Sequence, residues 1–219
     1  MLFNSLEYAA FLHIVFVIFW AAPGKYRWLI LLISSYIFYM GWNWRYIVLI
    51  IGVTITAYSS GIMIEKWFNT NTAKKVLLCS VVINLGILFI YKYFNFFLEN
   101  IVMIGGLFNK FVDISFFHII LPVGISFYIF QAMGYIIDVY KGKTNAEHHF
   151  GKFAAYISFF PQLVAGPIER AENLLPQIKE ERNFSYENAV YGLKKIAWGF
   201  FKKIVIADTL ALDVDRVYG

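Results

Sequence analysis

The sequence predicts an all-α polytopic membrane protein with about five spanning helices, and three observations lead to that class. Hydrophobic residues make up 60% of the 219-residue chain and charged residues only 15%, whereas soluble domains hold about 45–50% and about 25%. Aromatic residues make up 20%, which is more apolar surface than one soluble core of this size can bury. Six runs of 16 to 24 residues contain no Asp, Glu, Lys or Arg. Together these features exclude a soluble enzyme, a disordered segment and a coiled coil.

Five of the six charge-free runs are predicted to span the membrane, because a spanning helix needs about 20 mostly apolar residues. These runs are 8–24, 28–44, 46–64, 76–91 and 114–137. Residues 92–113 are aromatic and apolar but carry charges and a Gly-Gly pair, which predicts a helix lying in the outer interface or a lid over a cavity. Residues 1–140 are therefore interpreted as five spans with an interfacial segment, within a single membrane domain over 1–219.

The sixth run, residues 153–168, is short and broken. Pro161 removes a backbone donor, and Gly166 followed by Pro167 should end a helix. Broken backbone at membrane depth is tolerated only against protein or a water-filled cavity, because lipid offers no hydrogen bonds. The run is predicted to be a re-entrant hairpin at a cytoplasmic cavity; the alternative is a helix that ends at the surface with ordinary turn residues.

Residues 186–212 are predicted to form a basic amphipathic helix. Apolar residues recur at helical spacing on one side, and the other side carries four lysines: Lys194, Lys195, Lys202 and Lys203. Such a helix lies along an anionic cytoplasmic leaflet; alternatively, the same face binds an acidic carrier protein or the phosphates of coenzyme A. Residues 141–219 are thus interpreted as a cytoplasmic-side hairpin followed by this helix.

The net charge of +5 comes from basic residues between the apolar runs, so we expect no nucleic-acid interface. With the N-terminus outside, the inner connections hold eight Lys and Arg residues and the outer ones three. This asymmetry predicts an extracytoplasmic N-terminus and a cytoplasmic 141–152 segment.

Polar residues near or within apolar runs are candidates for function, because each is costly in lipid unless paired. Gln131 lies in the fifth run and Asp138 directly after it; Asp138 could equally sit at the interface beside Lys141. The adjacent His148 and His149 point apart on any regular element and no second ligand pair exists, so no metal site is expected.

Two long segments closely resemble the signatures of the membrane-bound O-acyltransferases. Residues 121–142 read LPVGISFYIFQAMGYIIDVYKG, and residues 158–170 read SFFPQLVAGPIER. The similarity is to the bacterial branch that contains the membrane subunit of alginate O-acetyltransferase and the teichoic-acid D-alanylation protein. Shorter stretches at 31–40, 91–96 and 199–210 agree in the same order, so the resemblance covers the whole chain.

The resemblance implies a helical ring around a tunnel through a bacterial cell membrane. In it, an acyl group, expected to be acetyl, passes from a cytoplasmic thioester donor to hydroxyls of an extracytoplasmic polysaccharide or cell-wall polymer. It further implies no bound cofactor, acetyl-CoA or an acylated carrier protein as donor, and extracytoplasmic acetyl-transfer subunits as partners. The family's essential histidine has a Trp-His-Gly-like setting that no histidine here matches. The chain is therefore expected to be the N-terminal half of a member, inactive alone, with the catalytic histidine beyond residue 219.

Motif position assigns five residues to the tunnel or donor side, with no catalytic role for any of them: Gln131, Asp138, Gly166, Pro167 and Arg170. Two other classes of function stay open. A small-solute transporter or flippase also uses broken helices, although the chain shows no internal repeat. A non-catalytic membrane scaffold is the third possibility.

Overall fold

The computed structural model describes residues 5–107, 121–164 and 166–218. Within these ranges the chain is helical and has no strand, which confirms the predicted all-α class. The chain divides into two compact units, Ala21–Glu180 and a second unit of Met1–Trp20 with Glu181–Gly219. One membrane domain over 1–219 therefore stays a prediction.

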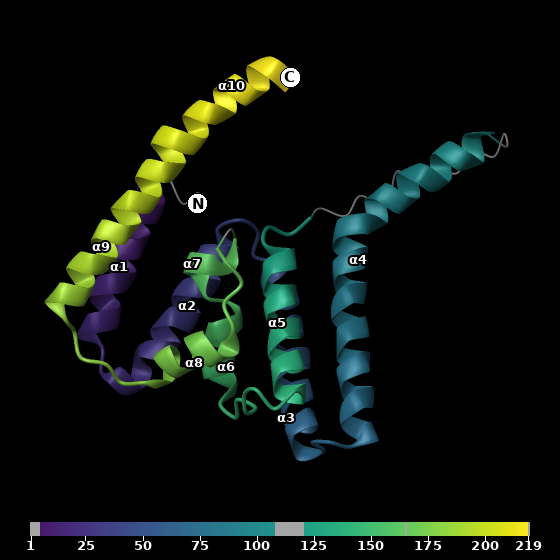
Figure 1. Cartoon of the computed structure of the whole chain (residues 1–219), viewed down its shortest axis with the longest axis horizontal. Helices are drawn as coiled ribbons and strands as arrows, with labels where there is room; N and C mark the ends of the chain where they lie inside the picture. Colours follow the sequence, from purple (N-terminus) through teal and green to yellow (C-terminus); the bar gives the residue numbers. More distant parts are fainter. Residues whose placement is uncertain (1–4, 108–120, 165, 219) are drawn as a thin grey trace. The chain divides into compact units, whose positions relative to one another are not determined.

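Four helices of the unit Ala21–Glu180 run alternately in opposite directions: α2 (Arg27–Met40), α3 (Tyr46–Lys66), α4 (Asn71–Leu107) and α5 (Ile125–Tyr140) (Figure 1). Helix α3 is central, because it packs against α2, α4, α5 and the short helix α6 (Phe150–Ile157). Its inward face is fully buried at Val53, Ala57 and Ile64. The apolar residues on that face form the core with matching residues of α5 and α6.

Two helices of the described chain are long and apolar enough to cross a membrane, α3 and the Asn71–Asn100 part of α4. The apolar helices α1 (Leu6–Ala21) and α5 are shorter, so the count of five spans stays a prediction. Helix α4 continues to Leu107 and changes direction along its length (Figure 1), so 92–107 is no separate element. Lys92 and Glu99 do not end α4, because lysine and glutamate are both good helix formers. Residues 108–113 of the predicted interfacial segment lie outside the described residues.

Within the described chain, the fifth predicted span, 114–137, is wrong only over 121–124, because α5 begins at Ile125. Pro122 has no backbone N–H, and Gly124 has a φ of 76°, in the left-handed region that favours glycine. The Tyr39 hydroxyl holds this turn by donating to the Val123 carbonyl at 3.0 Å. Residues 114–120 of the predicted span lie outside the described residues.

Helices α3 and α5 approach each other closely where Gly61 faces Tyr135. A β-carbon added at Gly61 would lie 2.6 Å from the Tyr135 hydroxyl oxygen, too close for a real contact. Tyr135 is almost fully buried, so its ring has little room to move. Small residues at such positions let helix backbones pack tightly in a membrane protein.

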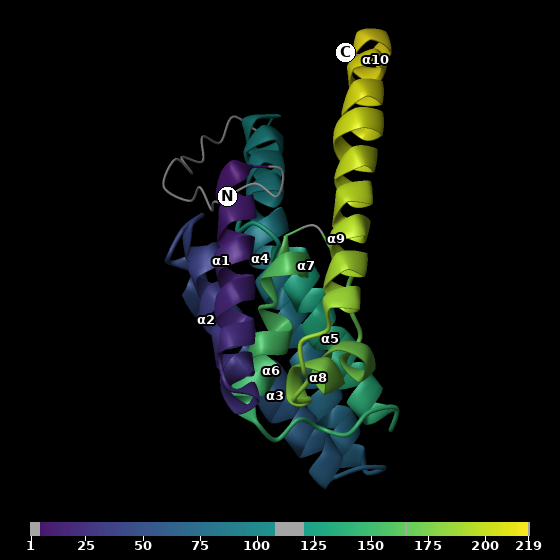
Figure 2. The ribbon, with the colours of Figure 1, turned by 90° about the vertical axis from the view of Figure 1, so that its left-hand side faces the viewer.

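The second unit contains α1 and a helical rod that begins at Tyr186, as predicted. The rod consists of α9 (Tyr186–Phe200), the π-helical segment η2 (Phe201–Ala207) and α10 (Asp208–Tyr218), which follow one another without a break (Figures 1 and 2). The Ser185 hydroxyl caps its start by accepting from Asn188 N at 3.3 Å. The helix predicted over 186–212 is thus confirmed, and none of its residues is buried.

Candidate functional site

The segment predicted to be broken is confirmed as broken. Helix α6 ends at Ile157, α7 covers only Phe160–Leu163, and α8 begins at Ala171 and ends at Lys179. Pro161 lies in the first turn of α7, where a missing N–H has no helical partner to lose. Its membrane topology as a re-entrant hairpin stays a prediction.

Side chains from neighbouring helices satisfy the backbone groups at the break between α6 and α7. The Gln131 side-chain nitrogen, from α5, donates to the carbonyl of Tyr156 at 2.8 Å. The backbone N–H of Phe160 donates to the Ser35 hydroxyl oxygen, from α2, at 3.2 Å. Both bonds are buried, and they replace bonds that a continuous helix would make within itself. The break is therefore packed against protein, which is a setting that tolerates irregular backbone in a membrane.

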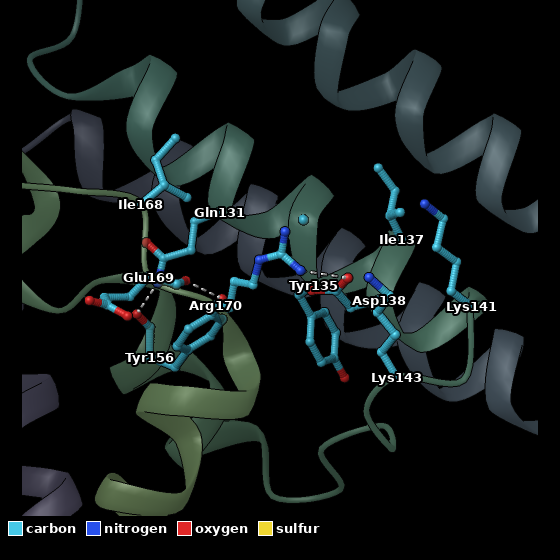
Figure 3. A pocket seen from close by; sticks show the side chains of 11 residues that line it. Gln131, Tyr135, Ile137, Asp138, Lys141, Lys143, Tyr156, Ile168, Glu169 and Arg170 are labelled. Carbon is cyan, nitrogen blue, oxygen red and sulfur yellow. Dashed lines mark hydrogen bonds and ion pairs between the residues drawn. The ribbon is translucent and has the colours of Figure 1, made fainter.

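A pocket of about 320 Å³ lies between α5, α6 and the segment that precedes α8 (Figure 3). Helix α5 and the turn after it supply most of its wall: Gln131, Gly134, Tyr135, Ile137, Asp138, Lys141 and Lys143. Tyr156 of α6 and Ile168, Glu169 and Arg170 complete it. Three of the five residues predicted for the site, Gln131, Asp138 and Arg170, are therefore brought together here.

Three cationic side chains and two carboxylates line this pocket. The Arg170 guanidinium lies 3.8 Å from the Asp138 carboxylate (Figure 3), and more than half of the arginine side chain is exposed. A guanidinium offers five N–H donors, so one long ion pair leaves most of them for a ligand. Lys141 and Lys143 are exposed at the turn after α5. With Ile137 and Ile168 in the wall, the pocket suits a ligand that has both an anionic group and an apolar part.

The structure does not bring Gly166 and Pro167 into the pocket. A β-carbon added at Gly166 would lie 2.5 Å from the Cα atom of Gln162, so this glycine permits a close approach of backbone behind α7. Pro167 is exposed and precedes the pocket residue Ile168. Both residues shape the chain that leads to Arg170, and their assignment to the donor side stays a prediction.

Two carboxylates anchor the loop that connects α5 to α6. Glu65 of α3 accepts from Ala146 N at 2.8 Å and contacts the His148 ring at 2.7 Å. Glu147 is 4% exposed, accepts from His149 N at 2.8 Å and pairs with Lys179 of α8 at 2.6 Å.

Each histidine of the adjacent pair thus has its own structural contact. His148 pairs with Glu65, while the His149 ring accepts from Lys152 N at 3.2 Å at the start of α6. In the part of the chain that the structure describes, no group of three or more His, Cys, Asp and Glu side chains gathers as a metal site would require.

The four lysines of the predicted basic face are exposed on α9 and η2. Lys195 lies over the Tyr191 ring at 4.6 Å, and Lys202 lies over the Trp198 ring at 5.4 Å. Lys203 pairs with Asp208 at the start of α10. Their contact with a membrane surface stays a prediction.

Curated relatives match nearly the whole chain. It is 37% identical over 209 residues to "Probable alginate O-acetylase AlgI" of Pseudomonas aeruginosa, covering 95% of this chain and 40% of that protein. It is 38% identical to the protein of the same name in Pseudomonas syringae pv. tomato, with the same coverage of both chains. It is 33% identical to "Peptidoglycan O-acetyltransferase" of Helicobacter pylori, covering 84% of this chain and 38% of that protein.

Over the matched length, the chain resembles bacterial O-acetyltransferases of the membrane-bound O-acyltransferase type. It spans about 40% of the length of the curated relatives it matches. No family model and no solved structure matches it.

Both segments that resemble the O-acyltransferase signatures contribute to the pocket. Segment 121–142 supplies the α5 wall, and segment 158–170 supplies Ile168, Glu169 and Arg170. Gln162, which lies in the second segment and is buried, is not among the residues predicted for the site. The reasoning that selected Gln131, that a polar side chain in an apolar run needs a partner, applies equally to Gln162.

Proposed function

We propose that this chain is the N-terminal part of a bacterial membrane O-acyltransferase and that the pocket receives its thioester donor. In this proposal an acetyl group passes to hydroxyls of an extracytoplasmic polysaccharide or cell-wall polymer. The observation that carries the proposal is the meeting of the two signature segments, distant in sequence, around a pocket with Arg170, Lys141 and Lys143 in its wall. The names of the relatives support acetyl transfer to a polymer.

The reaction itself is a transfer of an acyl group between a sulfur and an oxygen. The acceptor hydroxyl oxygen attacks the thioester carbonyl carbon while its proton goes to a general base. The C–S bond then breaks, and the base returns the proton to the sulfur, so that the donor leaves as a thiol. We assign that base to the part of the relatives that this chain does not span. The residues here would bind and align the donor and keep water from its thioester.

Two donor classes fit the pocket's charge. Acetyl-CoA and the phosphopantetheine arm of an acylated carrier protein both carry phosphate beside a flexible chain. Guanidinium groups bind phosphate oxygens through paired, charge-assisted hydrogen bonds, so Arg170 is the proposed anchor for either donor. No protein-bound cofactor is needed for this chemistry.

Lysine placement supports a cytoplasmic face for the pocket in the bacterial inner membrane. The turn between α3 and α4 and the turn after α5 lie at the same end of the unit Ala21–Glu180 (Figure 1). Lys66 ends α3, Lys74 lies in the first turn of α4, and Lys141 and Lys143 follow α5. Arg45, between α2 and α3, lies at the opposite end. Lysine-rich ends face the cytoplasm in membrane proteins, so we assign this end to the cytoplasm and the N-terminus to the extracytoplasmic side. The expected partners are extracytoplasmic transfer subunits.

Substitution of Arg170 by alanine in the full-length protein tests the donor site. We expect the KM for the donor to rise about tenfold, since a hydrogen bond to a charged group contributes about 1.5–3 kcal/mol and Arg170 is partly exposed. The matched control is Arg216→Ala, because Arg216 is exposed and pairs with Asp213 on its own helix at 3.5 Å. Unchanged donor kinetics in Arg170→Ala, with normal membrane insertion, would remove Arg170 from the site.

Cysteine labelling tests the orientation. A cysteine at Asn145, in the exposed loop after α5, should resist a membrane-impermeant maleimide in intact cells and react after lysis. Efficient labelling of intact cells would place this loop outside and reject the cytoplasmic assignment.

A further inference from the structure

A chain of hydrogen bonds links α7 to the residue before Arg170. Gln162 of α7 donates from its side-chain nitrogen to the Gln131 side-chain oxygen at 2.8 Å. Gln131 in turn donates to the Tyr156 carbonyl at 2.8 Å. The Tyr156 hydroxyl then donates to the carbonyl of Glu169 at 3.0 Å (Figure 3).

Gln162 differs from the other residues of this series of hydrogen bonds. Gln131, Tyr156 and Glu169 all line the pocket, whereas Gln162 does not. Both glutamine side chains are buried, at 7% and 3% exposed for Gln162 and Gln131. A role for Gln162 in the pocket would therefore be exerted through Gln131.

The two amides define each other's orientation. A glutamine amide has an acceptor oxygen at one corner and a donor nitrogen at the other. If the Gln131 amide turned over, its nitrogen would face the Gln162 nitrogen and its oxygen would face the Tyr156 carbonyl. Both contacts would then be repulsive in a buried setting, where unpaired polar groups are costly. Gln131 therefore donates to Tyr156 for as long as Gln162 donates to Gln131.

We propose that Gln162 is a positioning residue that fixes the shape of the pocket without touching its ligand. Gln162 orients the Gln131 amide, and Gln131 binds the end of α6 at the Tyr156 carbonyl. The Tyr156 hydroxyl in turn binds the segment that carries Arg170. The effect on donor kinetics rests on the proposed function, whereas the effect on pocket shape does not.

The test uses a cysteine at Ile168, a pocket residue that is 48% exposed, in full-length protein whose other cysteines, including Cys79, are serine. The rate of maleimide labelling at this cysteine reports the pocket. Gln162→Met and Gln131→Met should each change the rate by about tenfold, because each leaves a buried polar group unpaired. The double variant should match Gln131→Met alone, because the effects of two directly bonded residues do not add. The matched control is Gln177→Met, because Gln177 is exposed and donates to Asn173 O on its own helix, α8, at 2.9 Å.

Donor kinetics separate this proposal from the proposed function. If Gln162→Met changes both labelling and the donor KM, both proposals stand. If the labelling rate changes, the effects of the two substitutions on it do not add, and acyl transfer is unaffected, the positioning role stands and the donor role of the pocket fails. Unchanged labelling in Gln162→Met, or additive effects in the double variant, overturns the positioning role.

A second variant covers the case in which Gln162→Met does not fold. Gln162→Glu has nearly the same shape, and its buried carboxyl group donates a hydrogen bond only when protonated. Relative to the parent protein at the same pH, its labelling rate should match the parent in acidic buffer and diverge in alkaline buffer. A ratio that does not change with pH contradicts the need for a donor at position 162.

Discussion

Replacement of Gly124 by alanine should destabilise the unit Ala21–Glu180 by about 2–5 kcal/mol. Two costs add. Gly124 has a φ of 76°, and the left-handed conformation costs an L-residue about 1–2 kcal/mol. The new β-carbon would also lie 2.4 Å from the carbonyl oxygen of Leu163, at the end of α7. Since this neighbour is backbone in a buried segment, relief requires α5 or α7 to shift, and such overpacking costs about 1–3 kcal/mol.

Gly86→Ala is the matched control and should have the opposite sign. Gly86 lies inside α4, and an added β-carbon there meets nothing within 4 Å. Alanine is the better helix former by up to about 1 kcal/mol, so this variant should be as stable as the parent or more stable. Denaturant unfolding in mixed micelles, followed by tryptophan fluorescence, measures both variants. If Gly124→Ala unfolds at the same midpoint as Gly86→Ala, then α5 does not begin against α7 as described.

Three further changes test the packing and the charged surface. Gly61→Ala should lower the free energy of unfolding by about 1–3 kcal/mol because its β-carbon would meet Tyr135, whereas Gly52→Ala, with nothing within 4 Å, should be neutral or stabilising in the same assay. Glu147→Gln should cost about 1.5–3 kcal/mol in thermal unfolding because the buried carboxylate loses its ion pair with the half-exposed Lys179 and its charge toward His149 N, and the exposed Glu172→Gln should change stability by less than about 0.5 kcal/mol. Glutamine at all four lysines of the basic face should weaken binding of a 185–212 peptide to phosphatidylserine vesicles by more than about tenfold; equal binding of both peptides would reject the leaflet contact. The four positions are Lys194, Lys195, Lys202 and Lys203.

The charge-free runs predicted the helices well where turns and charges coincide. The run 28–44 corresponds to α2, and the run 46–64 corresponds to α3 almost residue for residue. The charge-free run 76–91 predicted only part of α4, which covers Asn71–Leu107. A helix continues through lysine and glutamate wherever its backbone hydrogen bonds are kept. The absence of charge also failed to predict the start of α5. Pro122 and Gly124 form a turn before Ile125 although no charged residue is present there.

Motif position predicted some residues of the candidate site but not the hydrogen bonds that support it. Gln131, Asp138 and Arg170 were selected from two segments, and the fold brings them to one pocket. The bonds that support the pocket join residues far apart in sequence. Gln162 bonds to a partner 31 residues away, and the Ser35 hydroxyl accepts from a backbone N–H 125 residues away. No local pattern encodes such a pairing, because it depends on how α2, α5 and α7 pack together.

Protection of a pocket cysteine by the donor tests the central claim most directly. In the full-length protein with a single cysteine at position 168, saturating acetyl-CoA or acylated carrier protein should slow maleimide labelling. The slowing should be lost in Arg170→Ala and kept in Arg216→Ala. Labelling at the same rate with and without either donor would contradict the assignment of this pocket to the acyl donor.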